Sequence, residues 1–291
     1  MTGDVRIAVI GGSGLYRMPD LIDAERHQIE TPFGAPSDAI TVGTLAGRRV
    51  AFLPRHGVGH RYPPSRVPAR ANFYALKSLG VRAVISVSAV GSLREEIAPL
   101  HLVVPDQIVD RTTSRACTFF DQPGLVGHVS LAEPFCASLR GLLIAGAEEA
   151  GATVHAGGTY LCIEGPRFST KAESRLYRQW GLDIIGMTAM PEAQLAREAE
   201  MCYAVLALAT DYDVWHESAE GVSVEMVVRN LQRNVATAQD VLRRVVPRIA
   251  RDGDDACTTA LANALMTDPA HIPEAVRARL GILVEKYLSA R

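Results

Sequence analysis

The sequence predicts an α/β fold, a single domain with a central mixed, mostly parallel β-sheet flanked by helices. Short apolar runs alternate with longer segments of helical spacing, the pattern of a mainly parallel sheet covered on both faces. The run Val205–Ala209 has no polar residue, which is typical of a buried strand. Several such runs end in clusters of Gly, Ser, Arg or Asp, and open α/β sheets bind ligands at the carboxyl ends of their strands.

The expected elements follow in order along the chain. We expect strands at 5–10, 49–53, 83–87, 102–104, 107–109, 159–163, 183–185 and 205–209. The strand from Ala83 is expected to break at Ser88. We expect helices at 69–79, 134–150, 191–200 and 222–249, with glycines at 80 and 151 ending the first two. Residues 1–291 then form one domain, in which a hinge at 251–255 opens a C-terminal helical extension, 251–291, of two helices.

Composition excludes several classes of protein. Hydrophobic residues make up 48% of the 291 positions and the net charge is −2, which argues against disorder and against a nucleic-acid partner. No apolar stretch approaches the roughly 18 residues that span a membrane, and there is no signal-peptide pattern, so we expect a cytoplasmic protein. The five cysteines show no CxxC or zinc spacing and the histidines no HExxH, so we expect reduced thiols and no metal.

Asp211 and Asp213 directly follow the most apolar run. Residues two apart on an extended segment point the same way, so we expect both carboxylates to leave one sheet edge together. Such a pair can bind a metal, share a proton, or hold a heterocycle with neighbouring donor and acceptor atoms. A polar strand exit that caps a nearby helix is the simpler alternative, and this segment alone does not decide between them.

Three further strand ends carry groups that bind anions. The glycine loop 11–14 contains Ser13, but Arg17 stands where a dinucleotide fingerprint needs its third glycine, so only a turn with free backbone N–H groups remains. Arg55 and His56 follow the second strand, and Ser88 and Ala89 the third. Each cluster alone is equally typical of a turn or a surface cap. Three at one sheet edge favour an anion site.

Two more segments suggest contacts with a nucleoside. Phe168 lies on a Gly-Pro turn, where its ring can stack on a base or pack into the core. Thr188 and Met187 follow another strand, where the hydroxyl can donate to an anion and the thioether can line a sugar.

These segments together resemble the purine nucleoside phosphorylase superfamily, most closely its methylthioadenosine phosphorylase branch. The resemblance covers roughly residues 5–250 in order, and lies in the stretches 10–15, 31–38, 55–57, 91–96, 106–113, 132–136, 164–169 and 209–215. It implies the nucleoside phosphorylase fold and phosphorolysis of 5′-methylthioadenosine to adenine and 5-methylthioribose 1-phosphate. Inorganic phosphate would be a co-substrate, with no metal or organic cofactor.

The resemblance also implies roles for individual residues. Phosphate would be bound by Ser13, Arg55, His56, Ser88, Ala89 and Thr188. Met187 would contact the ribose and Phe168 the base. Asp211 would meet purine N7 and Asp213 the 6-amino group, and both would be catalytic. The 5′ substituent would lie against Val224 and Val227, with His128 contributed by a neighbouring subunit of a homo-oligomer, expected to be a trimer.

Position by position, the resemblance favours adenine over a 6-oxopurine. The oxopurine enzymes typically have asparagine at 211, glutamate at 169 and a histidine in the 5′ pocket, whereas this chain has Asp211, Ser169 and Val224. An ionised aspartate only accepts hydrogen bonds and therefore suits an amino group. Gly186 departs from the asparagine usual in the methylthioadenosine branch and alters the expected ribose wall.

Four alternatives remain at this stage. A phosphorylase of another 5′-substituted 5′-deoxyadenosine, for example a 5′-halogenated one, would use the same apolar 5′ pocket. A 6-oxopurine nucleoside phosphorylase would need different residues at 169 and 211. A catalytically silent nucleoside-binding protein should have lost Arg55, His56 or Asp211, and an NAD-binding module is disfavoured by Arg17.

Overall fold

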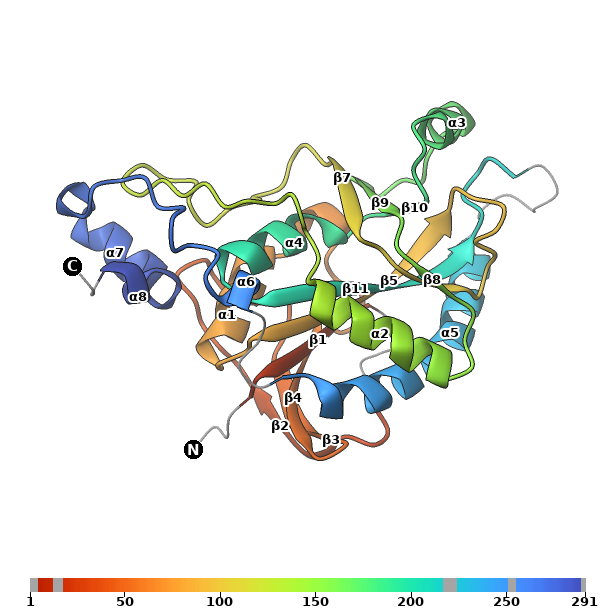
Figure 1. Ribbon diagram of the computed structural model, residues 1–291, viewed down its shortest axis with the longest axis horizontal. Coiled ribbons are helices and arrows are strands. Elements are labelled where there is room, and N and C mark those ends of the chain that lie inside the picture. The colour runs from red at the N-terminus through yellow and green to blue at the C-terminus, as the bar shows by residue number, and fades with distance from the viewer. Residues whose placement is uncertain (1–4, 13–17, 217–223, 251–254, 289–291) are drawn as a thin grey trace.

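A computed structural model describes residues 5–12, 18–216, 224–250 and 255–288. Its centre is an eleven-stranded sheet with helices on both faces (Figure 1). The strands are β1 (Ile7–Gly11), β2 (Ile22–His27), β3 (Ile40–Leu45), β4 (Arg48–Pro54), β5 (Ala83–Ser92), β6 (Leu102–Val104), β7 (Gln107–Arg111), β8 (Val154–Ala156), β9 (Thr159–Ile163), β10 (Ile184–Gly186) and β11 (Cys202–Asp211). The predicted fold class, a mixed and mostly parallel sheet flanked by helices, is confirmed.

The helices vary widely in length. The α-helices are α1 (Ala69–Ser78), α2 (Ala137–Glu149), α3 (Lys171–Gln179), α4 (Ala189–Glu198), α5 (Val224–Val245), α6 (Asp255–Thr258), α7 (Glu274–Leu280) and α8 (Glu285–Leu288). Short 3₁₀ helices are η1 (Pro64–Arg66), η2 (Val246–Arg248), η3 (Pro269–His271) and η4 (Gly281–Leu283). Among the described residues, no helix combines the length and the apolar character that crossing a membrane requires.

Strand β5 is the branch point of the sheet. It runs parallel to β1, with Ala83 opposite Ile7, and parallel to β11, with Ala83 opposite Cys202. Its last residues pair antiparallel with β10. Strand β4 lies parallel to β1 on the other side. Because β1, β4, β5 and β11 all point the same way, their carboxyl ends meet at one edge of the sheet, where polar clusters were expected.

Side chains alternate between two apolar layers, as strand geometry requires. On β11, Tyr203, Val205 and Ala207 belong to the layer that contains α1 and α4, together with residues of the C-terminal segment. Cys202, Ala204 and Leu206 belong to the layer under α2 and α5. All ten residues of β11 are buried, which confirms the prediction of a strand covered on both faces. Helices α7 and α8 lie at the opposite end of the molecule from α3 (Figure 1).

One predicted boundary is wrong for an identifiable reason. The strand from Ala83 does not break at Ser88 but continues to Ser92. Ser88 lies opposite Ala207 of β11, and Gly91 lies opposite Ile185 of β10, so neighbouring strands satisfy the backbone across the polar stretch. The polar composition of residues 88–92 predicted the end of the strand. The strands that pair with these residues are far away in the chain and could not be recognised from the local sequence.

Several short elements were not predicted. The edge strand β2, its neighbour β3, the three-residue β8 and the helix α3 were not predicted from the sequence. Helix α3 begins with a capping box, in which Thr170 accepts from the Glu173 N–H and the Glu173 carboxylate accepts from the Thr170 N–H. Predicted helices 134–150 and 191–200 are observed at Ala137–Glu149 and Ala189–Glu198. Residues 251–254 of the proposed hinge lie outside the described residues, and the extension contains α6, α7 and α8.

Candidate active site

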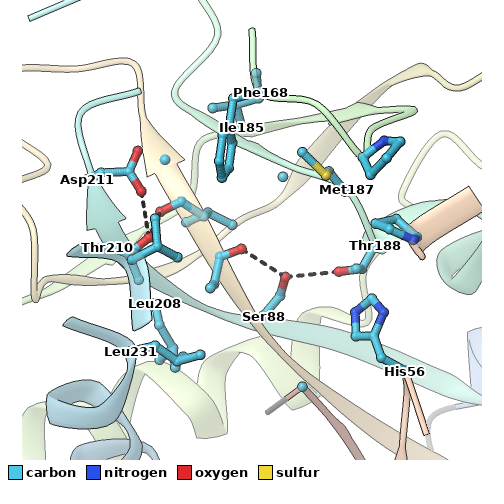
Figure 2. Close-up of a pocket in the computed structure, with 18 of the residues that line it drawn as sticks. His56, Ser88, Phe168, Ile185, Met187, Thr188, Leu208, Thr210, Asp211 and Leu231 are labelled. Atoms are coloured by element: carbon cyan, nitrogen blue, oxygen red, sulfur yellow. Dashed lines mark hydrogen bonds between the residues drawn. The ribbon is translucent and has the colours of Figure 1, made fainter. Parts of the chain in front are cut away.

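A cavity of about 710 Å³ opens at the carboxyl edge of the sheet (Figure 2). Most of the residues named from sequence line it together, namely Arg55, His56, Ser88, Ala89, Phe168, Met187, Thr188, Asp211, Asp213, Val224 and Val227. Ser13 lies outside the described residues. His128 does not line the cavity in this chain; its side chain is on an exposed loop, and its N–H donates to the Ala264 carbonyl.

One end of the cavity is rich in hydroxyl groups. Ser88 on β5 and Thr188, the N-cap residue of α4, place their hydroxyl oxygens 2.9 Å apart, with His56 beside them (Figure 2). Helix α4 is kinked at its start, where Met190 has non-helical dihedral angles (φ −108°, ψ 137°) and Pro191 has no N–H, so the hydroxyl groups are the donors here. Two hydroxyl groups that converge beside an imidazole in this way form a cradle for an anion.

Arg55 is a fixed charge behind this cradle. Its side chain is 2% exposed, and its Nε donates to Glu192 Oε1 at 2.6 Å. Its two Nη atoms donate to the Val87 carbonyl at 3.0 Å and to Ser86 Oγ at 2.7 Å. Burial opposes the charge on Arg55, but the Glu192 carboxylate outweighs it, so the pKa of Arg55 is raised. Hydrogen bonds to protein groups therefore use much of the guanidinium group that was predicted from the sequence to bind the anion.

His56 is neutral and has a defined tautomer. Burial, followed by the charge of Arg55, lowers the pKa of His56 to about 4. Its Nδ1 lies 2.9 Å from the Tyr62 carbonyl oxygen, which only accepts, so Nδ1 carries the proton. The remaining ring nitrogen, Nε2, is then an acceptor. His60 stacks on the ring with centroids 4.2 Å apart. His56 can thus accept a proton or a hydrogen bond from an acidic hydroxyl.

The two aspartates lie at the other side of the cavity, in a geometry that the sequence did not predict. The segment is not extended through both residues, because Asp213 has φ +49°. The chain turns there, and the Asp213 N–H donates to Asp211 Oδ1 at 2.8 Å. Thr210 Oγ1 donates to the other carboxylate oxygen at 2.7 Å. Both side chains line the cavity, as expected, although the expected extended segment is wrong; that they share a target stays a prediction.

Burial raises the pKa of both aspartates. Burial is the largest cause that raises the pKa of Asp211 to about 6, and the neighbouring charge of Asp213 adds to it. Burial also raises the pKa of Asp213. Asp213 Oδ2, Ser169 Oγ and Ser174 Oγ are buried and form no hydrogen bond of regular geometry with the described residues, yet both hydroxyl groups lie close enough to Asp213 to lower its pKa against the larger effect of burial. Ser169 and Asp213 line the cavity and Ser174 does not, so Asp213 Oδ2 and Ser169 Oγ are candidates for ligand contacts.

Apolar side chains form the walls between the two ends. Phe168, Ile185 and Met187 lie along one side (Figure 2). Val224 and Val227 of α5 also line the cavity. Val224 is 67% exposed. An exposed apolar side chain beside a cavity is typical of a surface that contacts a ligand or a partner.

Sequence reasoning missed three residues that organise the site. Glu192 shares its predicted helix with Glu198 and Glu200, so the sequence carried no signal that it forms a buried ion pair. Arg115 donates to the Met187 carbonyl at 2.7 Å and the Glu164 carbonyl at 2.8 Å, which ties two cavity loops together. Tyr160 was indistinguishable from a core residue of its apolar strand, yet its hydroxyl reaches Ser88 Oγ at 3.5 Å.

The chain belongs to the phosphorylase superfamily, whose sequence pattern matches residues 6–247. More particularly, it is 56% identical over 283 residues to the S-methyl-5′-thioadenosine phosphorylase of Geobacter sulfurreducens, covering 97% of this chain and 99% of the relative. The enzyme of the same name from Chloroflexus aurantiacus is 56% identical over 284 residues, covering 97% and 98% of the two chains.

Solved structures agree with this placement. A methylthioadenosine phosphorylase from an Antarctic soil metagenomic library superimposes with a TM-score of 0.91 at 50% identity, covering 96% of this chain and 99% of that one. The methylthioadenosine phosphorylase of Schistosoma mansoni, in complex with adenine, gives a TM-score of 0.83 at 38% identity, covering 89% and 96% of the two chains.

Proposed function

We propose that this protein is an S-methyl-5′-thioadenosine phosphorylase, a pentosyltransferase that converts 5′-methylthioadenosine and phosphate into adenine and 5-methylthioribose 1-phosphate. The observation that carries the proposal is the cavity itself. It sets an anion cradle at Ser88 and Thr188 across from a pair of buried carboxylates, in a chain whose relatives of that name are 56% identical over almost their full length. The whole chain, 1–291, forms the phosphorylase domain, with 251–291 as its helical extension.

The anion cradle binds inorganic phosphate. Ser88 and Thr188 donate hydroxyl hydrogens to the phosphate oxygens, and Ala89 and Ser13 are the further phosphate ligands that the family resemblance implies. Arg55, held by Glu192, contributes a fixed positive potential. The unprotonated Nε2 of His56 accepts the one hydroxyl hydrogen of the hydrogen phosphate dianion, which turns a bare oxygen toward the sugar. Positioning and electrostatics supply most of the catalysis in such a site.

The carboxylate end acts on the leaving base. Cleavage of the bond between purine N9 and C1′ gives the sugar oxocarbenium character, and the bond electrons pass to the purine. Asp211, whose pKa is raised to about 6, supplies a proton to N7 and so neutralises the departing base. A phosphate oxygen then forms the new bond to C1′ while Met187 contacts the ribose.

Substrate choice follows from the same geometry. Asp213 Oδ2 is the acceptor for the 6-amino group of adenine, and Ser169 Oγ is an adaptable partner beside it. Phe168 covers the face of the base. Val224 and Val227 offer an apolar surface to the 5′ substituent, where a methylthio group is accommodated without an unpaired polar atom.

The assembly is a homo-oligomer, and we propose a trimer. Val224, Val228 and Phe168 are exposed apolar residues around the same cavity, and exposed apolar surface of this kind supports a contact with a neighbouring subunit. His128 lies on an exposed loop and is the residue that a neighbouring subunit would contribute to the 5′ pocket. The working enzyme is cytoplasmic and uses phosphate as co-substrate, without a metal or an organic cofactor in the active site.

Adenine release from 5′-methylthioadenosine tests the proposal directly. We expect adenine and a sugar phosphate in equal amounts, with release dependent on phosphate. Equal rates without phosphate would make the protein a hydrolase and remove the phosphate assignment. Inosine and adenosine measured in parallel separate the adenine and 5′-thio preferences. The Asp211→Asn variant should lose adenine selectivity toward inosine-type substrates; retained selectivity would exclude Asp211 from choosing the base.

A further inference from the structure

Three cysteines that are scattered along the sequence meet in the core, far from the cavity described above. Cys136 immediately precedes α2, Cys202 is the first residue of β11, and Cys257 lies in α6. Their Sγ atoms all lie within 4.8 Å of one another. Their exposed fractions are 4%, 3% and 4%. Among the described residues, this is the one group of three or more His, Cys, Asp or Glu side chains with metal-binding spacing.

The spacing suits coordination of one ion by three thiolates. Zinc–sulfur bonds are about 2.3 Å long, which places sulfur atoms about 4 Å apart around a shared ion. Thiolate sulfur is a soft ligand that selects Cu⁺ and Zn²⁺ over Mg²⁺ or Ca²⁺. We propose that Cys136, Cys202 and Cys257 form a structural binding site for a thiophilic d¹⁰ cation of the Cu⁺ or Zn²⁺ class.

The start of α2 favours a thiolate at Cys136. Cys136 is the N-cap residue of α2, a 13-residue helix whose positive dipole end stabilises a thiolate. Ser138 Oγ lies 3.1 Å from Cys136 Sγ and is a further polar neighbour. Arg197 donates to the carbonyl of Ala256, next to Cys257, and to the carbonyl of Glu133, near Cys136. These contacts tie α6 to the segment before α2.

The location indicates a structural role. Cys202 and Asp211 are the two ends of β11, and a strand of ten residues is about 30 Å long, so the ion would not touch the phosphorolysis site. It would instead join three segments that are distant in sequence. The loop before α2, the start of β11 and the C-terminal helix α6 would share one set of bonds. The sequence shows no closely spaced metal ligands, and for this reason no metal was predicted. Spacing along the chain cannot reveal ligands that only folding brings together.

Metal titration of the reduced, metal-free full-length protein tests the site. The probes are Zn²⁺, Cu⁺ under anaerobic conditions, and Cd²⁺ as an ultraviolet charge-transfer reporter. We expect one ion per chain, a rise in Tm on binding, and an unchanged rate of phosphorolysis. In a competition between Zn²⁺ and Cu⁺, the ion that binds more tightly identifies the class of cation that the site selects. Absence of thiolate charge transfer with all three probes would overturn the proposal.

Variants localise the ion. Cys257→Ser should lower affinity at least about 100-fold and abolish the Tm rise while phosphorolysis continues. Cys117→Ser is the matched control, since this half-buried thiol lies outside the cluster and binding should persist. Unaltered binding in Cys257→Ser would contradict the assignment. X-ray absorption of the loaded wild-type protein gives an answer that does not depend on variant folding. Three sulfur neighbours support the site, and a shell of nitrogen and oxygen rejects it.

Discussion

The hydroxyl group of Tyr160 occupies the space that a side chain on Gly186 would need. A Cβ added at position 186 would overlap the tyrosine oxygen and its ring carbon. Tyr160 is fully buried on β9, directly beside β10, and its hydroxyl lies within reach of Ser88. The two residues therefore form one unit, in which the tyrosine fills the wall that an asparagine at 186 would otherwise build. The departure at Gly186 is thus compensated from a neighbouring strand.

Gly186→Asn should consequently be disruptive by itself. Overpacking of a buried site costs about 1–3 kcal/mol, and the displaced Tyr160 hydroxyl would disturb Ser88. We expect a lower Tm and a raised KM for phosphate. Tyr160→Leu makes room, so the double variant should be more stable than the sum of the single effects predicts. A double-mutant cycle by denaturant unfolding measures this coupling, and strict additivity would show that the two positions are independent.

Asp211→Asn should change both the pH dependence and the stability. The folded pKa of about 6 exceeds the usual 3.8, so ionisation costs folding free energy, and this cost grows as pH rises from about 4 to about 6. Removing the charge should stabilise the variant by at most roughly 3 kcal/mol at about pH 8, and much less near pH 4. Thermal unfolding across this range checks the trend; a pH-independent difference would contradict it. In the wild type, kcat/KM should fall above about pH 6, and the variant should lack that limb.

His56 should remain neutral in the free enzyme down to low pH. The pKa of His56 is about 4 in the folded protein and near 6.5 in the unfolded chain, so the unfolded chain takes up the proton more readily. The folded state therefore keeps its full stability above about pH 6.5 and loses free energy of unfolding as the pH falls toward 4. A bound phosphate dianion near Nε2 should raise this pKa. Histidine NMR with and without saturating phosphate, assigned through a His56→Asn variant, measures both values. Titration near 6.5 without phosphate would disprove the buried neutral state.

Glu192→Gln should affect phosphate more than nucleoside. The variant leaves Arg55 buried without its counter-charge, a change that costs about 3–5 kcal/mol in comparable pairs. We expect a lower Tm and a KM for phosphate raised more than the KM for nucleoside. Tyr203→Phe is the control, because it removes a 2.8 Å hydrogen bond to the same carboxylate and keeps the charge. Equal effects of the two variants on phosphate KM would show that the ion pair does not position Arg55.

Val227→His should shift the preference at the 5′ position. An imidazole beside the substituent can pair with a 5′-hydroxyl, whereas a methylthio group would leave it unpaired. We expect the ratio of kcat/KM for adenosine to that for 5′-methylthioadenosine to rise about 10- to 100-fold. Asp213 and Ser169 are untouched, so adenine selectivity over inosine should persist. An unchanged adenosine ratio would place the 5′ group elsewhere in the cavity.

The sequence alone predicted much of the site because strand ends carry a strong local signal. Apolar runs such as that of β11 must be buried, and in a parallel sheet their polar ends must meet at one edge. Arg55, Ser88 and Asp211 were found in this way. The ends of the elements were predicted less accurately, because the extension of β5 to Ser92 depends on pairing with β10 and β11. Edge strands such as β2 are mostly exposed and give no clear apolar pattern.

Only the tertiary structure decided which residues that are distant in the chain contact one another. Residue types and their order determined the fold class, the family and the position of the cavity, because burial and backbone hydrogen bonding act on local patterns. Contact between Arg55 and Glu192, between Tyr160 and the space beside Gly186, and among three dispersed cysteines arises only when the sheet brings separate segments within a few ångströms. Desolvation, which sets the pKa of Asp211 and His56, likewise exists only after the chain has closed around them.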